Sequence, residues 1–151
     1  MERLVIRFLE RPDSNDPEQI IKWFCEVFGL AGEGEKNPIE EQILKNFVQA
    51  AQHDSGLSSS ELKLETDLAR STVIYHLNRF IDAGLLVKRG RKYFLRASEM
   101  QKAIEEIEYD VSREMQRMMD TAKEFDMMLH GAASAKKVRI DDSEAVEVKV
   151  E

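Results

Sequence analysis

The sequence lacks the cysteine pairs and clusters that build disulfides and zinc sites, and it lacks the long apolar runs that build membrane spans. Its 151 residues include one cysteine, Cys25, so no internal disulfide and no cysteine cluster for zinc is expected. No apolar run approaches the roughly 18 residues that a membrane span requires. The first residues show neither the basic start nor the apolar block of a signal peptide. We therefore expect a cytoplasmic protein that does not insert into a membrane.

Motifs of catalysis are also missing. The sequence contains no glycine-rich phosphate loop and no histidine paired with a cysteine or serine. Its acidic residues are spread over expected helix surfaces, where solvated charge is the ordinary explanation. The three histidines, which are not at the spacing of metal ligands, are His53, His76 and His130. We therefore expect no enzymatic activity, no bound metal and no cofactor.

The charges of the chain are segregated along the sequence. The net charge of −7 argues at first against a nucleic-acid partner. However, residues 70–96 contain seven basic residues and one acid, a net charge of +6, whereas the rest of the chain has a net charge of −13. This pattern is typical of a polyanion-binding face on an acidic body. A solvated basic stretch is the alternative.

The first half of the chain predicts a strand followed by two helices. Residues 3–9 are rich in β-branched and aromatic types, with Leu4, Ile6 and Phe8 at alternate positions, which predicts a short strand. Asp16 and Pro17 start a helix that runs to about residue 28 and ends at Gly29. After a linker at residues 31–37, Asn37 and Pro38 start a second helix to about residue 52, with Glu40 completing a capping box.

Residues 55–96 predict a short helix, a turn, a longer helix and two strands joined at Gly90. In the longer helix, Val73, Leu77, Phe80 and Ile81 share a face that must be buried, and Gly84 ends the helix in a left-handed conformation. Side chains that can reach a DNA major groove and its phosphates are expected on the opposite face: Arg70, Ser71, Thr72, Tyr75, His76 and Arg79.

Three assignments in this region have alternatives. Ser71 lies at the helix start, where capping competes with DNA contact. His76 could be a metal ligand, a DNA contact or a packed polar residue, and its isolation from other ligands disfavours metal. Four cations bracket the expected hairpin tip, where their positive charges repel one another. Phosphates facing them would offset this repulsion. The alternative is a chance cluster on a solvated turn. The four cations are Lys88, Arg89, Arg91 and Lys92.

The stretch SSSELKLETDLARSTVIYHLNRFIDAGLLVKRGRKYFLR resembles the winged helix-turn-helix of prokaryotic transcription regulators, most closely the ArsR-like and MarR-like branches. The resemblance covers about residues 38–96. It implies a buried Leu68 in the turn, a recognition helix STVIYHLNRFIDAGLL and a wing LVKRGRKYFLR. Metal-sensing ArsR-like proteins carry a cysteine pair in the helix before recognition; here that stretch is ELKLETDL, which argues against this kind of metal sensing.

A long helix follows at residues 98–131. Ser98 and Gln101 are candidates for its capping box, and no glycine or proline interrupts it before residue 129. Its apolar residues recur about every 3.6 residues along the chain, which is the period of a straight helix and not the 3.5-residue period of a left-handed coiled coil. This stripe comprises Met100, Ile104, Ile107, Val111, Met115, Met118, Ala122, Phe125 and Leu129.

The length of this helix predicts self-association. It should extend about 48 Å at 1.5 Å per residue, beyond the roughly 30 Å of a small domain. From Ile104 onward we expect the stripe to form a homodimer interface. The alternatives are that the helix folds back over residues 17–28, or that its methionines form a ligand pocket rather than ordinary core.

These elements predict a mainly α protein with a small β wing. Its parts are an N-terminal extension (residues 1–37), a DNA-binding domain (38–97), a dimerisation helix (98–131) and a tail (132–151). In the tail, Val146, Val148 and Val150 alternate, which predicts a strand paired with residues 3–9, or else an acidic disordered tail.

We expect a homodimeric transcription regulator that binds double-stranded DNA with two recognition helices about 34–36 Å apart. The sequence does not identify a small-molecule effector. The alternative function is a winged-helix protein–protein adaptor that does not bind DNA.

Overall fold

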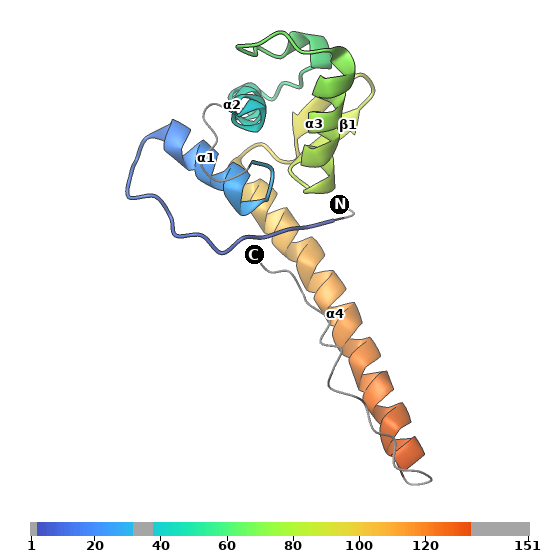
Figure 1. Cartoon of the computed structure of the whole chain (residues 1–151). Helices are drawn as coiled ribbons and strands as arrows, with labels where there is room; N and C mark the ends of the chain where they lie inside the picture. Colours follow the sequence, from blue (N-terminus) through green and yellow to red (C-terminus); the bar gives the residue numbers. More distant parts are fainter. Residues whose placement is uncertain (1–2, 32–37, 134–151) are drawn as a thin grey trace. The chain divides into compact units, whose positions relative to one another are not determined.

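The computed structural model describes residues 3–31 and 38–133 (Figure 1). Within these residues the protein is mainly helical, with four α-helices and one small two-stranded antiparallel sheet. The described chain divides into two compact units, the first ending at Glu105 and the second beginning at Glu106. None of the described helices is both long and apolar enough to cross a membrane.

Helix α1 (Pro17–Val27) forms as the sequence predicts. The Asp16 carboxylate accepts the Glu18 N–H at 3.2 Å, and proline occupies the first turn. Gly29 follows the helix with a φ of +66°, a conformation in which a side chain would be strained. The next segment, the expected linker, lies almost wholly outside the described residues.

The strand expected at residues 3–9 is absent. This segment is extended but has no strand beside it among the described residues, and it packs along α1 instead. The Arg7 N–H donates to the Val27 carbonyl at 2.7 Å, and the Trp23 indole donates to the Leu9 carbonyl at 3.4 Å. The strand prediction is therefore wrong, and the alternating apolar residues do not share a buried face, since residues 4–7 are half-buried and Phe8 is 78% exposed.

Helix α2 (Ile39–Ala51) starts differently from the prediction. Pro38 occupies the N-cap and no side chain caps the helix, so the expected capping box is wrong. Glu40 is instead buried and points its carboxylate at α3. Asn37 lies outside the described residues.

The short helix is a single 3-10 turn, η1 (Ser59–Glu61), closed by a capping box between Ser58 and Glu61. Helix α3 (Arg70–Asp82) begins at Arg70, with Ala69 at the N-cap and no side-chain cap, so the alternative that Ser71 caps it is wrong. At its other end the Gly84 N–H donates to the Ile81 carbonyl at 2.9 Å and the Leu85 N–H to the Phe80 carbonyl at 3.1 Å. This is a Schellman motif, and the φ of +83° at Gly84 confirms the predicted left-handed glycine.

Strands β1 (Leu86–Arg89) and β2 (Lys92–Leu95) form the predicted hairpin. Arg89 pairs with Lys92 across a two-residue turn in which Gly90 has a φ of +64°. Leu57 adds a β-bridge to Tyr93, with hydrogen bonds of 2.9 and 2.8 Å. The bridge joins the segment before η1 to the hairpin.

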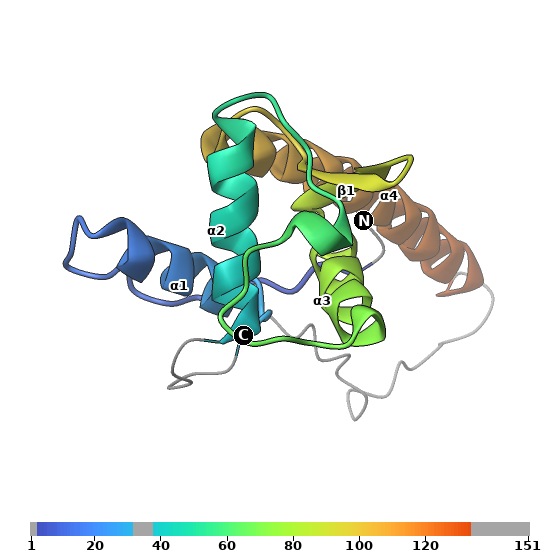
Figure 2. The ribbon, with the colours of Figure 1, turned by 90° about the horizontal axis from the view of Figure 1, so that it is seen from above.

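The core of the first unit lies among α2, α3 and the hairpin (Figure 2). Helix α3 contacts α2 and β1, and α1 packs on α2. Val73, Leu77 and Phe80 are buried as predicted, whereas Ile81 and Leu68 are half-buried. The largest fully buried side chains include Phe47, Phe80, Ile43, Leu44, Leu77, Leu85 and Leu86.

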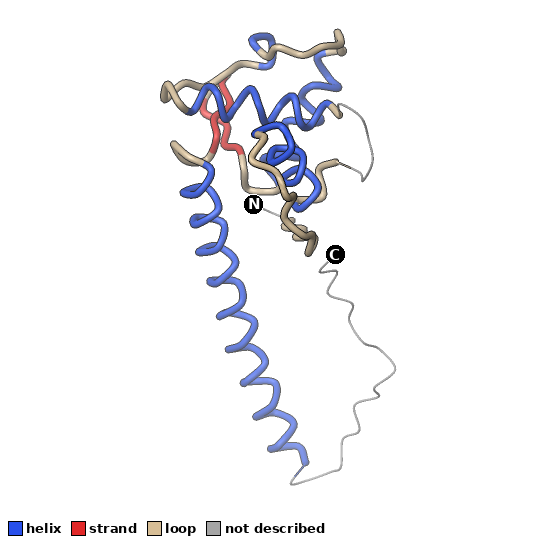
Figure 3. The backbone as a smooth tube through the Cα atoms, turned by 90° about the vertical axis from the view of Figure 1, so that its left-hand side faces the viewer, coloured by secondary structure: helices blue, strands red, loops and turns tan. Residues whose placement is uncertain are grey.

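Helix α4 (Met100–Ala133) is continuous over 34 residues (Figure 3). Its first backbone bond runs from the Ala103 N–H to the Glu99 carbonyl at 3.0 Å, so Glu99 occupies the N-cap in place of Ser98. The Gln101 side chain donates forward to Glu105 at 3.2 Å and takes no part in a capping box. The strand considered at Val146, Val148 and Val150 lies outside the described residues.

Candidate functional site

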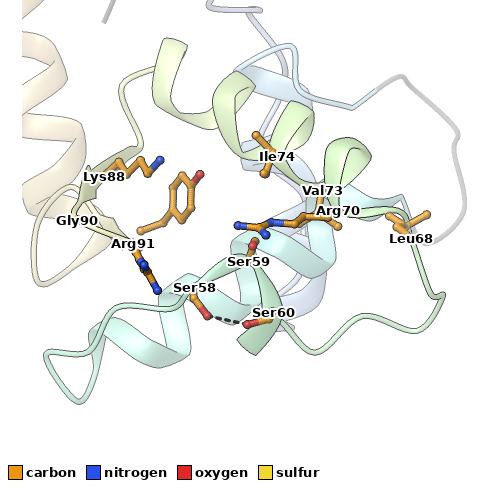
Figure 4. A pocket seen from close by; sticks show the side chains of 11 residues that line it. Ser58, Ser59, Ser60, Leu68, Arg70, Val73, Ile74, Lys88, Gly90 and Arg91 are labelled. Carbon is orange, nitrogen blue, oxygen red and sulfur yellow. Dashed lines mark hydrogen bonds between the residues drawn. The ribbon is translucent and has the colours of Figure 1, made fainter.

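An open groove of about 740 Å³ lies between the first turn of α3, the η1 segment and the hairpin (Figure 4). Three cationic side chains and three serines line it, together with apolar residues at the start of α3. No carboxylate is among the lining side chains. The lining residues are Ser58, Ser59, Ser60, Leu68, Arg70, Val73, Ile74, Lys88, Gly90, Arg91 and Tyr93.

Backbone pairing places the serines beside the hairpin. The Leu57–Tyr93 bridge fixes the chain immediately before Ser58 against β2. The Ser58 N–H then donates to the Glu61 carboxylate at 3.2 Å, and the Ser58 and Ser60 hydroxyls lie 3.1 Å apart. Gly56 allows this approach, because a Cβ there would lie 2.5 Å from the Phe94 ring. The serines are therefore held by secondary structure and not by a free loop.

The three cations of the groove have no acidic partner within residues 3–31 and 38–133. Arg70 comes from the first turn of α3, and Lys88 and Arg91 come from the hairpin. None of them forms an ion pair with a described residue. Lys88 lies over the Tyr93 ring, with its Nζ 5.5 Å from the ring centroid. Because α3 starts without a side-chain cap, the partial positive charge of its N-terminus adds to theirs.

The hairpin divides its four cations between different surroundings. Lys88 and Arg91 line the groove. Arg89 lies over Phe94, 5.4 Å from the ring centroid, and both line a second cleft of about 250 Å³. Lys92 Nζ lies 4.0 Å from Glu61 Oε1. Hydrogen bonds from the Ser58 side chain and backbone, and then the charge of Lys92, lower the pKa of Glu61.

Two residues predicted on the exposed face of α3 are engaged inside the protein. Arg79 Nη1 donates to Glu40 Oε1 at 3.0 Å, and its Nη2 donates to the Gly29 carbonyl at 3.1 Å. His76 Nδ1 also lies 3.0 Å from Glu40 Oε1, although the orientation gives no hydrogen bond. The prediction that His76 and Arg79 are exposed is therefore wrong, because the buried Glu40 carboxylate draws both side chains inward.

The other members of the predicted face are exposed. Arg70, Ser71 and Thr72 form the first turn of α3 and are exposed. One turn further, the Tyr75 side chain is 61% exposed. These four residues form one polar surface that begins at the edge of the groove.

The apolar stripe of α4 is largely exposed in the second unit. Ile107 is buried, and Ile104, Val111 and Leu129 are partly exposed. Met115, Met118 and Phe125 are 47%, 56% and 49% exposed, and Ala122 is exposed as well. These three large side chains therefore do not form an ordinary core.

Sequence reasoning missed three contributors to this region. Ser58 with Glu61 three residues later is the pattern of a capping box, and that spacing marks where the serines are held. Tyr93 and Glu40 carried no comparable signal, since their roles depend on contacts with distant segments. Within residues 3–31 and 38–133, no three histidine, cysteine or acidic side chains form a cluster that could hold a metal ion.

Comparison of the chain with protein-family models, curated proteins and solved structures found no match.

Proposed function

We propose that this protein is a DNA-binding transcription regulator of the winged helix-turn-helix type that acts as a homodimer. In this proposal α3 is the recognition helix and enters the major groove of DNA. The hairpin is the wing and contacts the phosphate backbone. The exposed face of α3 supplies Ser71, Thr72 and Tyr75 for base edges, and Arg70 for a phosphate.

One observation carries the proposal: the groove gathers cations from two separate elements and opposes them with no carboxylate. Like charges held close together destabilise a fold unless a counter-charge is present. Arg70, Lys88 and Arg91 have no such partner among the described residues. A phosphate backbone supplies the missing charge, and its binding releases condensed counterions.

The placement of α3 relative to the hairpin also supports DNA binding. Arg70, at the start of the polar face of α3, lines the same groove as the cations Lys88 and Arg91. A DNA duplex carries one negative charge per about 1.7 Å of its axis, so a continuous basic surface can engage several phosphates together. Arg79 and His76 are left out of this surface because both side chains turn toward Glu40: Arg79 donates to its carboxylate, and His76 Nδ1 lies 3.0 Å from Oε1.

The exposed stripe of α4 supports the homodimer. Met115, Met118 and Phe125 leave large apolar surfaces open to solvent. A second copy of the same stripe is the partner that a two-fold symmetric interface would supply. Such a dimer would present two recognition helices to successive major grooves, and would therefore favour a palindromic site.

A salt titration on double-stranded DNA tests the proposal. The protein should bind a random duplex at low salt, and log Kd should rise steeply with log salt concentration, by about 0.9 per neutralised phosphate. Changing Arg91 to Ala should flatten that slope by roughly one unit per protomer. Arg113→Ala, which removes the same charge from the second unit, should leave the slope unchanged.

The adaptor function makes the opposite prediction. It is favoured by one observation, the exposure of large apolar side chains such as Phe8 at 78% and Met118 at 56%. An adaptor would show little binding to duplex DNA even at low salt. That result would contradict the DNA-binding proposal.

A further inference from the structure

We propose that the groove beside α3 also binds the diphosphate group of a small molecule, and that this ligand competes with DNA. The competition rests on the proposed DNA-binding function. The binding of the diphosphate itself does not, because it follows from the residues that line the groove. The ligand would act as an effector by occupying a surface that DNA also needs.

The charge of the groove matches a diphosphate. Arg70, Lys88 and Arg91 converge on the groove without an acidic partner among the described residues. A phosphate monoester carries about −1.5 to −2 charges at pH 7, and a diphosphate carries more. Three cations on different sides of one groove can therefore contact both phosphoryl groups, whereas one DNA phosphodiester carries a single negative charge.

The hydrogen-bond donors of the groove suit the same ligand. The hydroxyls of Ser58, Ser59 and Ser60 line it beside the cations (Figure 4). The Ser58 hydroxyl is engaged in the capping box with Glu61, and the Ser60 hydroxyl lies 3.1 Å from it, so Ser60 can turn from Ser58 to a phosphoryl oxygen. The uncapped first turn of α3 adds the positive end of a helix dipole. These donors come from three separate segments and converge on one space.

The volume of the groove leaves room for an organic portion. Its 740 Å³ lies within the range of about 300–1,000 Å³ that is common for small-molecule sites. Leu68, Val73 and Ile74 line part of the groove and provide an apolar wall. A diphosphate held by the cations would place its attached group against this wall.

Calorimetric titration with sodium pyrophosphate, without DNA and at constant ionic strength, tests the site. The wild-type protein should bind one pyrophosphate per chain. Arg70→Ala should lower the affinity about tenfold or more, the loss expected for a charge-assisted hydrogen bond. Arg91→Ala should do the same. Circular dichroism and thermal unfolding check that each variant is folded.

Arg89→Ala is the matched control. It removes the same charge from the same hairpin, but Arg89 lies over Phe94 and lines the other cleft. Its pyrophosphate affinity should remain within about twofold of wild type, since only screened long-range attraction is lost. Equal losses in the Arg70 and Arg89 variants would overturn the proposal, because they would show general attraction to a basic surface. Absence of pyrophosphate binding would overturn it as well.

A second measurement separates this site from the proposed function. Pyrophosphate should displace duplex DNA from the wild-type protein at the concentrations at which it binds the groove. If the wild-type protein does not bind DNA but binds pyrophosphate with the expected dependence on Arg70, the diphosphate site stands and the DNA-binding proposal fails. If DNA binds but pyrophosphate does not, the reverse holds.

Discussion

Glu40 decides which side chains of α3 can face outward. It is buried at the start of α2, and its Oε1 lies 3.0 Å from both Arg79 Nη1 and His76 Nδ1. An ionised carboxylate without partners would be costly in this position. Arg79 also donates to the Gly29 carbonyl, so one guanidinium joins α3 to α2 and to the end of α1. Helical periodicity alone places Arg79 on the polar face, and only the tertiary contact reveals its role.

Arg79→Ala should therefore destabilise the fold, whereas Tyr75→Ala should not. Loss of Arg79 removes the hydrogen bonds to the Glu40 carboxylate and to the Gly29 carbonyl, at a cost of about 1–3 kcal/mol. Tyr75 is exposed, so its removal should change the free energy of unfolding by less than about 0.5 kcal/mol. Urea denaturation measures both. Equal stabilities would contradict the role assigned to Arg79, and a large loss for Tyr75→Ala would mean that this side chain is packed.

At the level of the elements, the order and approximate extent of the helices and the hairpin were the most predictable features. Helices α1, α2 and α3 and the hairpin follow the predicted order because proline, glycine and the apolar period are local signals. The strand at residues 3–9 failed because alternation cannot show whether a partner strand exists. The capping residues shifted because competing caps lie one or two residues apart, as Ser98 and Glu99 do.

The candidate site was predicted in part for the same reason. Its cations lie on a helix and a hairpin that the sequence indicates, so Arg70, Lys88 and Arg91 could be named in advance. The serines join them through the bridge between Leu57 and Tyr93, a pairing of distant segments without a local signal. Local patterns therefore specified the charges, and tertiary pairing specified the groove.

The packing of α1 on α2 predicts a pH-dependent stability. Burial is the largest cause that raises the pKa of Glu41. The positive charge of Lys22 lowers this pKa, and the negative charges of Glu26, Glu18 and Glu40 raise it. A folded-state pKa above the unfolded value means that the ionised carboxylate destabilises the fold. The penalty is absent below the unfolded pKa, grows as pH rises between the two values, and is complete above the folded value.

Glu41→Gln should accordingly raise the thermal midpoint at pH 7. The gain should be less than about 1 kcal/mol, because the side chain is partly exposed to solvent. It should disappear below about pH 4, where the wild-type carboxyl is protonated in both states. Glu18→Gln is the control, since a hydrogen bond from Lys45 at 2.6 Å lowers the pKa of Glu18. That variant should not gain stability, and an equal gain in both would contradict the assigned cause.

At the scale of the whole molecule, the proposed function needs both the basic surface and self-association. Residues 70–96 concentrate positive charge while the rest of the chain is acidic, so DNA should be attracted to one surface and repelled by others. A single copy would contact a short half-site only. The exposed stripe of α4 is the feature that would pair two such surfaces and multiply their affinity.

Met118→Glu should convert a dimer to a monomer in sedimentation equilibrium, because it would place a charge in the centre of the stripe. Val111→Glu should act in the same way.

Met127→Glu is the matched control. Met127 is also exposed, but it lies nine residues from Met118, which is two and a half helical turns and therefore the opposite face of α4. The helicity of all three variants should match wild type. On a palindromic DNA site the Met118 variant should bind with the affinity of a single half-site, while the Met127 variant should bind as tightly as wild type. An unchanged mass for Met118→Glu and Val111→Glu would show that this stripe is not the dimer interface, and equal dissociation in the Met127 variant would mean that added charge alone separates the chains.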